Sequence, residues 1–296
     1  MTRRLLPLAL SSLLLGACAS SPATDAGADT PAAEADAAAA APSTAGVAAR
    51  APDPLLDAAL GGSWRSAENT ARDRYRHPRE TLTFLGIEPG QTVVEITPGG
   101  GWYAEILAPY LRTGYVAAVV DPDAYEAGRS RDYQARNKSA LEAKFAAAPA
   151  QYGDARIVAY DPKAPVFGAP GSADAVLTFR NVHNWRSAGQ AEGMFKGFHA
   201  VLKPGGVLGV VEHRASGDVA ADDKSGYVGQ AQVIALAQAA GFRLDAQSEV
   251  NANPKDTRDH PNGVWTLPPS NDHDAEDRQQ YAEIGESDRM TLRFVK

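Results

Sequence analysis

Short apolar, β-branched runs alternate with segments of helical periodicity along most of this 296-residue chain. The runs predict strands at residues 91–97, 115–121, 155–161, 173–179, 207–213, 243–250 and 289–296. The segments between them predict helices at residues 101–111, 135–148, 188–202 and 229–242. Because parallel strands need crossover connections, this alternation predicts an α/β fold with a mostly parallel sheet and helices on both faces.

Breaker residues set the expected helix ends. Pro109 and then Gly114 mark the end of the first of these helices, and the run 203–206 (Lys-Pro-Gly-Gly) closes the third.

Polar groups gather where the predicted strands end. Glu95, Asp121 and Asp161 fall at the carboxyl ends of the first three strands, and a polar cluster at 180–185 follows the fourth. Sheets of this type bind ligands at this edge, near the switch point in strand order. The sequence therefore predicts one crevice lined by all four groups.

The N-terminus has the features of an export signal. Arg3 and Arg4 precede an apolar core, residues 5–15, which is shorter than the about 20 residues that a membrane-spanning helix needs. We therefore expect a signal peptide at 1–17. The segment ending at Cys18 resembles a bacterial lipoprotein box, in which the cysteine becomes lipidated. Cys18 is the only cysteine, so an intrachain disulfide is impossible.

Composition separates a tether from a domain. Residues 19–52 contain 16 alanines, four prolines and no aromatic residue, which is too little apolar surface to order the segment. We expect a lipidated cysteine and flexible tether at 18–52 and one domain at 53–296. Lipidation would anchor the protein to a membrane, facing the periplasm, and Ala19 after the cysteine favours the outer membrane by resemblance to the usual sorting pattern.

A glycine loop follows the first strand. Residues 99–104 fit G-x-G-x-x-A, and Asp121 lies 22 residues beyond Gly99, as in dinucleotide-binding proteins. A tight turn without a ligand is the simpler alternative. Glu95 favours another cofactor, because a carboxylate would repel a pyrophosphate but attract a ligand that carries an amine and a sulfonium.

The pattern apolar–apolar–Glu–x–x–x–Gly–x–Gly at 93–101 resembles motif I of the class I S-adenosylmethionine-dependent methyltransferases. "LKPGGVLGVVEH" and "AQAAGFRL" resemble later segments of that family, and the resemblance covers roughly 80–245. It implies a Rossmann-like class I methyltransferase fold with a seven-stranded sheet, S-adenosylmethionine as cofactor and a small-molecule acceptor. Four phrases, "GGGWYAEILAPYL", "VLTFRNVHNW", "NPKDTRDHPNGVWTLPPS" and "IGESDRM", resemble a subgroup of predicted, signal-bearing, lipoprotein-type bacterial methyltransferases.

The resemblance assigns specific residues to the cofactor: Glu95, Thr97, Gly99, Gly101, Asp121 and Asp161. Asp121 matches the acid that binds the ribose, and Asp161 lies near the adenine contact. Thr97 departs from the pattern, because it stands where the family has its first glycine. Its hydroxyl could bind the methionine carboxylate, whereas Pro98 removes one backbone donor.

The residues after the fourth strand would face the methyl group in this family. We expect His183 to accept a proton from the acceptor and Asn181 to orient it. Trp102 and Trp185 could stack on an aromatic acceptor or on the sulfonium. A hydrogen-bonded structural cluster is the alternative interpretation of the same residues.

Glu212 and His213 end the fifth strand beside the same crevice. They could supply a base, an orienting pair or a satisfied structural pair, and we favour His183 over His213 as the base. The remaining histidines, His77, His199, His260 and His273, are expected to be solvated or capping residues.

Several functions are disfavoured. The chain has no H-x-x-x-H and no C-x-x-C, so we expect no dedicated metal site. A formal net charge of −7 without a basic tract makes it a poor candidate for nucleic acid.

Two flanking segments are expected near the site. Residues 254–270 form either a lid over the substrate or a surface excursion packed through Trp265 and Leu267. Residues 64–85 are expected to form helices that cap the cofactor.

The expected location conflicts with the expected cofactor. S-adenosylmethionine is made in the cytoplasm and is charged, so it would not cross a membrane unaided. The sequence therefore leaves two main hypotheses, with a dehydrogenase as a distant third. One is an S-adenosylmethionine-dependent methyltransferase. The other is an envelope lipoprotein that kept the fold as a pseudoenzyme or ligand-binding protein.

Overall fold

The computed structural model describes residues 52–296, so the predicted signal peptide, Cys18 and nearly all of the predicted tether lie outside the described residues. A seven-stranded sheet has the order β3-β2-β1-β4-β5-β7-β6. Its strands are β1 (Val93–Ile96), β2 (Tyr115–Val120), β3 (Arg156–Tyr160), β4 (Ala173–Phe179), β5 (Leu202–His213), β6 (Arg243–Ser248) and β7 (Arg289–Val295). β7 pairs antiparallel with both of its neighbours, β5 and β6, and the other neighbouring strands pair parallel. This arrangement confirms the predicted Rossmann-like fold with a mostly parallel seven-stranded sheet.

Helices cover both faces of the sheet. They are α1 (Pro54–Leu60), α2 (Ala67–Thr70), α3 (Asp73–Arg76), α4 (Pro78–Leu85), α5 (Ala104–Leu111), α6 (Arg129–Ala147), α7 (Pro149–Tyr152), α8 (Val182–Ser187), α9 (Ala191–Val201), α10 (Gln230–Ala239) and α11 (Arg278–Ile284). α8, α9 and α10 bury apolar side chains such as Phe195 and Phe198 on one face. α1 and α4–α7 bury Leu107 and Leu141 on the other.

α5 ends at Leu111, as predicted, and α9 ends at Val201, one residue before its predicted end, but the breaker residues do not act as the sequence suggested. Pro109 lies inside α5, where it leaves the carbonyl of Glu105 without a helical donor. The Trp64 indole N–H donates to that carbonyl oxygen at 2.8 Å, so the N-terminal segment compensates for the proline. The run 203–206 belongs to β5 rather than to a helix stop, because Leu202 already pairs with Ala173 of β4 ahead of a bulge.

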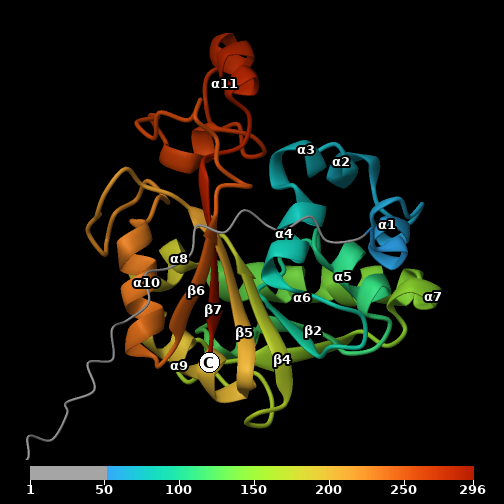
Figure 1. Cartoon of the computed structure of the whole chain (residues 1–296). Coiled ribbons are helices and arrows are strands. Elements are labelled where there is room, and N and C mark those ends of the chain that lie inside the picture. Colours follow the sequence, from blue (N-terminus) through green and yellow to red (C-terminus); the bar gives the residue numbers. More distant parts are fainter. Residues whose placement is uncertain (1–51) are drawn as a thin grey trace, which may run out of the picture. The chain divides into compact units, whose positions relative to one another are not determined.

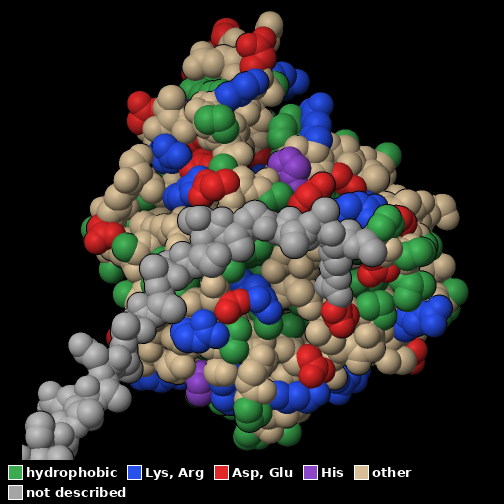
Figure 2. All heavy atoms as spheres, viewed as in Figure 1, with side chains coloured by type: hydrophobic (Ala, Val, Ile, Leu, Met, Phe, Trp, Pro, Cys, Tyr) green, Lys and Arg blue, Asp and Glu red, His purple; other side chains and the backbone are tan. Residues whose placement is uncertain are grey.

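Two segments extend beyond the carboxyl edge of the parallel strands. Figure 1 shows α2 and α3 on one side of this edge and the segment around α11 on the other, with the C-terminus at the opposite end of the sheet. On the face seen in Figure 2, acidic and basic side chains are interspersed. No helix among residues 52–296 combines the length and apolar character needed to cross a membrane.

Candidate active site

A cavity of about 360 Å³ opens at the carboxyl edge of the sheet. The glycine loop after β1, the turn after β4, the end of β5, helices α2 and α3, and the segments 264–270 and 286–287 all contribute to its wall. The sheet order explains this meeting, because β1 and β4 are neighbours and their carboxyl ends adjoin.

The glycine loop keeps the backbone that close approach to a ligand requires. Thr97, Gly99 and Gly101 have positive φ angles of 52°, 58° and 77°. A Cβ added to Gly99 or Gly100 would meet nothing within 4 Å, and both residues line the cavity. A Cβ on Gly101 would instead lie 2.9 Å from Cδ1 of Leu141, so this glycine is needed for packing under the loop.

Thr97 adopts the left-handed conformation that the family's glycine would have. A β-branched residue is strained there, so surrounding contacts must hold it. Its hydroxyl oxygen lies 2.7 Å from the hydroxyl oxygen of Tyr160, and its N–H donates to the Ala118 carbonyl at 2.8 Å. These contacts hold the loop with Thr97 in the left-handed conformation that favours glycine.

Glu95 is a buried acid on the wall of the cavity. Its Oε2 accepts a hydrogen bond from the Tyr115 hydroxyl at 2.5 Å. Burial raises the pKa of Glu95 to about 7, although the Tyr115 hydrogen bond and the charge of Arg180 act in the opposite direction. Its carboxyl group therefore responds to any cation that enters the cavity near neutral pH.

Asp121 and Asp161 do not line the cavity. Each ends its strand as predicted, but the side chain of Asp121 accepts from the Asp123 N–H at 3.0 Å and that of Asp161 from the Lys163 N–H at 2.8 Å. The single crevice predicted from the sequence therefore gathers Glu95 and the post-β4 cluster, and it leaves these two acids outside. Their predicted ribose and adenine contacts stay predictions.

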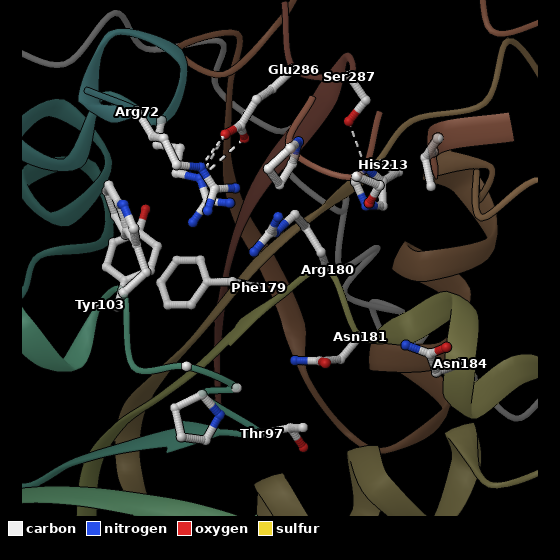
Figure 3. A pocket seen from close by; sticks show the side chains of 18 of the residues that line it. Arg72, Thr97, Tyr103, Phe179, Arg180, Asn181, Asn184, His213, Glu286 and Ser287 are labelled. Atoms are coloured by element: carbon white, nitrogen blue, oxygen red, sulfur yellow. Dashed lines mark hydrogen bonds and ion pairs between the residues drawn. The ribbon is translucent and has the colours of Figure 1, made fainter. Parts of the chain in front are cut away.

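The turn after β4 directs polar groups into the cavity. Phe179 stacks on Tyr103 with ring centroids 3.6 Å apart, and Arg180 follows with a φ of 62°. Asn181 donates through Nδ2 to the Ile96 carbonyl at 3.1 Å, which fixes its amide on the cavity wall. Arg180 and Asn181 lie between Thr97 on one side and Arg72 on the other (Figure 3).

His183 pairs with Glu212. Its Nδ1 lies 3.1 Å from Oε1 of this fully buried carboxylate, which also accepts from the backbone N–H groups of Val182 and His213 at 2.5 and 2.8 Å. This contact orients the imidazole through Nδ1, and the other ring nitrogen, Nε2, takes no part in it. The side chain is 11 % exposed and lines the cavity wall.

His213 has a different partner from the one considered in the sequence. Its Nδ1 lies 2.5 Å from the Ser287 hydroxyl oxygen. Burial, together with nearby His183 and Arg180, lowers the pKa of His213 well below its ordinary value, so this imidazole is neutral. The His213 imidazole contacts Ser287 rather than the Glu212 carboxylate, although ligand atoms of Glu212 and His213 lie within 4.8 Å of one another.

His183, Glu212 and His213 form the only grouping in residues 52–296 whose ligand atoms could together hold a metal ion. The sequence missed it because the residues come from α8 and β5 rather than from one local motif. Both Glu212 oxygens already accept backbone hydrogen bonds, which argues for an anchoring role of this carboxylate.

Two other sequence interpretations are resolved by position. Trp185 packs in the core against Phe198 and does not reach the cavity, whereas Trp102 does line it. The side chain of His260 is 5 % exposed and its Nε2 lies 2.8 Å from Asp256, so this histidine is a buried structural residue rather than a solvated one.

Both flanking segments lie over the site. Asn69 and two arginines of the N-terminal helices line the cavity, as expected for a cap. The predicted lid, residues 254–270, combines the two interpretations left open by its sequence. Leu267 is fully buried and anchors the loop, while Trp265 lines the cavity with its ring centroid 6.0 Å from that of His183.

A group of arginines was not predicted. Arg72, Arg76 and Arg180 line the cavity. Arg72, Arg76 and Arg289 form ion pairs with the carboxylate of Glu286. Arg180, Glu286 and Arg289 are distant in sequence from the two N-terminal arginines, so no local pattern indicates that they meet. The spacing of Arg72 and Arg76, four residues apart in a segment expected to cap the site, was the available sign.

This chain resembles known proteins only remotely. No family model matches the sequence, and no curated protein matches it. An S-adenosylmethionine-dependent methyltransferase from Aquifex aeolicus has a TM-score of 0.47 at 11 % identity, over 76 % of this chain and 92 % of its own. The [4+2]-cyclase SpnF has 0.48 at 16 %, over 82 % and 92 %. A TehB-like methyltransferase from Corynebacterium glutamicum has 0.45 at 15 %, over 82 % and 100 %.

Proposed function

We propose that this protein is an S-adenosylmethionine-dependent methyltransferase acting on a small molecule. One observation carries the proposal: the glycine loop with Glu95 and the His183–Glu212 pair border the same cavity. A fold alone would not support an activity, because one fold hosts many reactions.

The cofactor half would be built from residues already in place. Glu95 would attract the cofactor's ammonium and sulfonium, and the open backbone at Gly99 and Gly100 would allow close approach. When bound, the cofactor supplies an electrophilic methyl group.

His183 would act as the base. Its Nε2 would accept the proton of an acceptor O–H or N–H, while the electrons of that bond form the new bond to carbon and sulfur keeps those of the broken carbon–sulfur bond. Glu212 would stabilise the resulting imidazolium. With an accepted substrate, we expect His183→Ala to slow transfer by about 10²–10⁴-fold without weakening cofactor binding; His273→Ala, which alters a residue outside the cavity lining, is the control.

Calorimetric titration with S-adenosylhomocysteine tests the cofactor. We expect micromolar binding by the wild type, a loss of at least tenfold in Glu95→Gln, and no change in Glu142→Gln, which alters an exposed acid of α6. Absence of binding by the folded wild type would remove the proposal and favour a ligand-binding protein on this fold.

We also propose that Cys18 is lipidated and anchors the protein in the cell envelope, with the outer membrane favoured. The sequence around this cysteine supports the proposal. Cys18→Ser should abolish incorporation of a radiolabelled fatty acid and release the protein from the membrane fraction. Unchanged incorporation would contradict it. An envelope location would require an exported supply of cofactor.

A further inference from the structure

We propose that Arg72, Arg76 and Arg180 form an anion subsite that holds a carboxylate or phosphate group of the methyl acceptor. The assignment of the anion to a methyl acceptor rests on the proposed function. The anion subsite itself rests on the geometry of the cavity.

The first argument is an imbalance of charge. Glu286 is the carboxylate to which Arg72, Arg76 and Arg289 are paired, with N–O distances of 2.8, 3.1 and 3.1 Å. Arg180 adds a fourth guanidinium to this side of the cavity. Burial opposes ionisation of Glu286, but the arginines lower its pKa to about 2. Three arginines therefore pair with one carboxylate, and Arg180, which is also attracted by Glu212, is a fourth cation on this side.

The second argument is unused hydrogen-bonding capacity. Arg76 is 2 % exposed, and one of its terminal nitrogens has no partner; the same holds for one terminal nitrogen of Arg72. Within residues 52–296 the guanidinium of Arg180 has neither a hydrogen bond nor a salt bridge. A bound carboxylate or phosphate would satisfy such groups through paired N–H donors.

Arg65 provides an internal comparison. It is buried in the same N-terminal segment, but its two terminal nitrogens hold both oxygens of Asp73 at 2.6 and 2.7 Å. This arginine has the partner expected of a structural ion pair. The Nε of Arg65 also lacks a partner, but both of its terminal nitrogens are bonded, whereas a terminal nitrogen of Arg76 and the guanidinium of Arg180 have capacity left for a ligand.

Placement assigns the anion to the acceptor. In Figure 3, Arg72 and Glu286 lie on the side of the pocket away from Thr97, with Phe179, Arg180 and Asn181 between them. The positive φ of Arg180 holds its backbone in a conformation that points the side chain toward this region. An acceptor held there would extend past Arg180 toward His213, across the turn from the glycine loop.

Titration with inorganic phosphate, with and without saturating S-adenosylhomocysteine, tests the inference on the purified protein. We expect phosphate to bind in both conditions, Arg180→Met to weaken it at least tenfold, and the exposed Arg136→Met to change it less than twofold. S-adenosylhomocysteine affinity should change less than threefold in Arg180→Met.

The arms separate the possible sources. If phosphate competes with S-adenosylhomocysteine and Arg180→Met loses both, the arginines hold the cofactor's carboxylate and the inference is overturned. Equal phosphate affinity in Arg180→Met and wild type also overturns it. Phosphate binding without any binding of S-adenosylhomocysteine would keep the anion subsite and remove the proposed function. If Arg180→Met does not fold, Arg180→Lys keeps the charge and should lose less than Arg180→Ala.

Discussion

Two buried glutamates on one cavity wall behave in opposite ways. Glu95 and Glu286 are 3 % and 4 % exposed, yet the pKa of the first is raised to about 7 and that of the second is lowered to about 2. Burial penalises the charge of both. The difference lies in the neighbours, because Glu95 accepts one hydrogen bond from Tyr115 whereas Glu286 is surrounded by guanidinium groups.

The two sides of the cavity therefore differ in their balance of acidic and basic side chains. Within residues 52–296 Glu95 has no salt-bridge partner, although Arg180 and Lys144 attract its charge, whereas Glu286 alone pairs with three arginines. A cationic cofactor and an anionic acceptor would correct both at once. Charge in this cavity is therefore arranged for two ligands rather than for self-neutralisation.

Removing the second acid should have the largest effect. Glu286→Gln leaves buried guanidiniums without their carboxylate, so we expect the free energy of unfolding to fall by about 3–5 kcal/mol. Urea unfolding at pH 8 measures it. Glu249→Gln, which alters an exposed partner of Arg214, should change it by less than about 1 kcal/mol. Equal losses of stability in the two variants would contradict the role assigned to Glu286.

The pH dependence of stability should separate the two acids by sign. Glu95 keeps its proton in the folded state up to about pH 7, so the free energy of unfolding should fall by about 3 kcal/mol as the pH rises from 4.5 to above 7. Glu286 has a lowered pKa, so its contribution is present above pH 4.5 and is lost as the pH falls toward 2. Unfolding curves of wild type and Glu95→Gln should diverge above pH 4.5. Parallel curves would show that Glu95 ionises normally.

The affinity for the cofactor should depend on pH through the same ionisation of Glu95. A cation beside Glu95 favours the ionised acid, so binding of S-adenosylhomocysteine below about pH 7 must release a proton. We expect affinity to fall by up to about tenfold per pH unit below 7 and to level off above it. Glu95→Gln should flatten the profile. An unchanged profile in that variant would place the ligand's ammonium elsewhere.

The smallest effect is expected at the loop itself. Thr97→Gly relieves a left-handed β-branched residue, worth about 1 kcal/mol or more, and removes the hydroxyl contact to Tyr160, worth about 1 kcal/mol. The two should nearly cancel in unfolding experiments, and S-adenosylhomocysteine affinity should stay within threefold. Tyr160→Phe, which removes only the contact, should destabilise by about 1 kcal/mol. A large loss of affinity in Thr97→Gly would assign the threonine hydroxyl to the ligand.

The sequence predicted the sheet well because its information is local. β-branched runs locate the strands, and the glycines with Glu95 locate the loop, since each pattern lies within a few residues.

The rest depends on contacts between distant segments. Thr97 is held by Tyr160 from β3, and Arg72, Arg180 and Glu286 meet from three parts of the chain. Asp121 and Asp161 show the converse. Their positions at strand ends were predictable, but the limits of the cavity depend on the lid and the N-terminal helices, whose course the sequence leaves open.

The decisive measurement is a crystal structure of the protein grown with both S-adenosylhomocysteine and phosphate. We expect the ligand's ammonium at Glu95 and the ligand along the backbone of Gly99 and Gly100, with a separate phosphate between Arg76 and Arg180. A ligand carboxylate lying between those arginines, with no second anion, would contradict it.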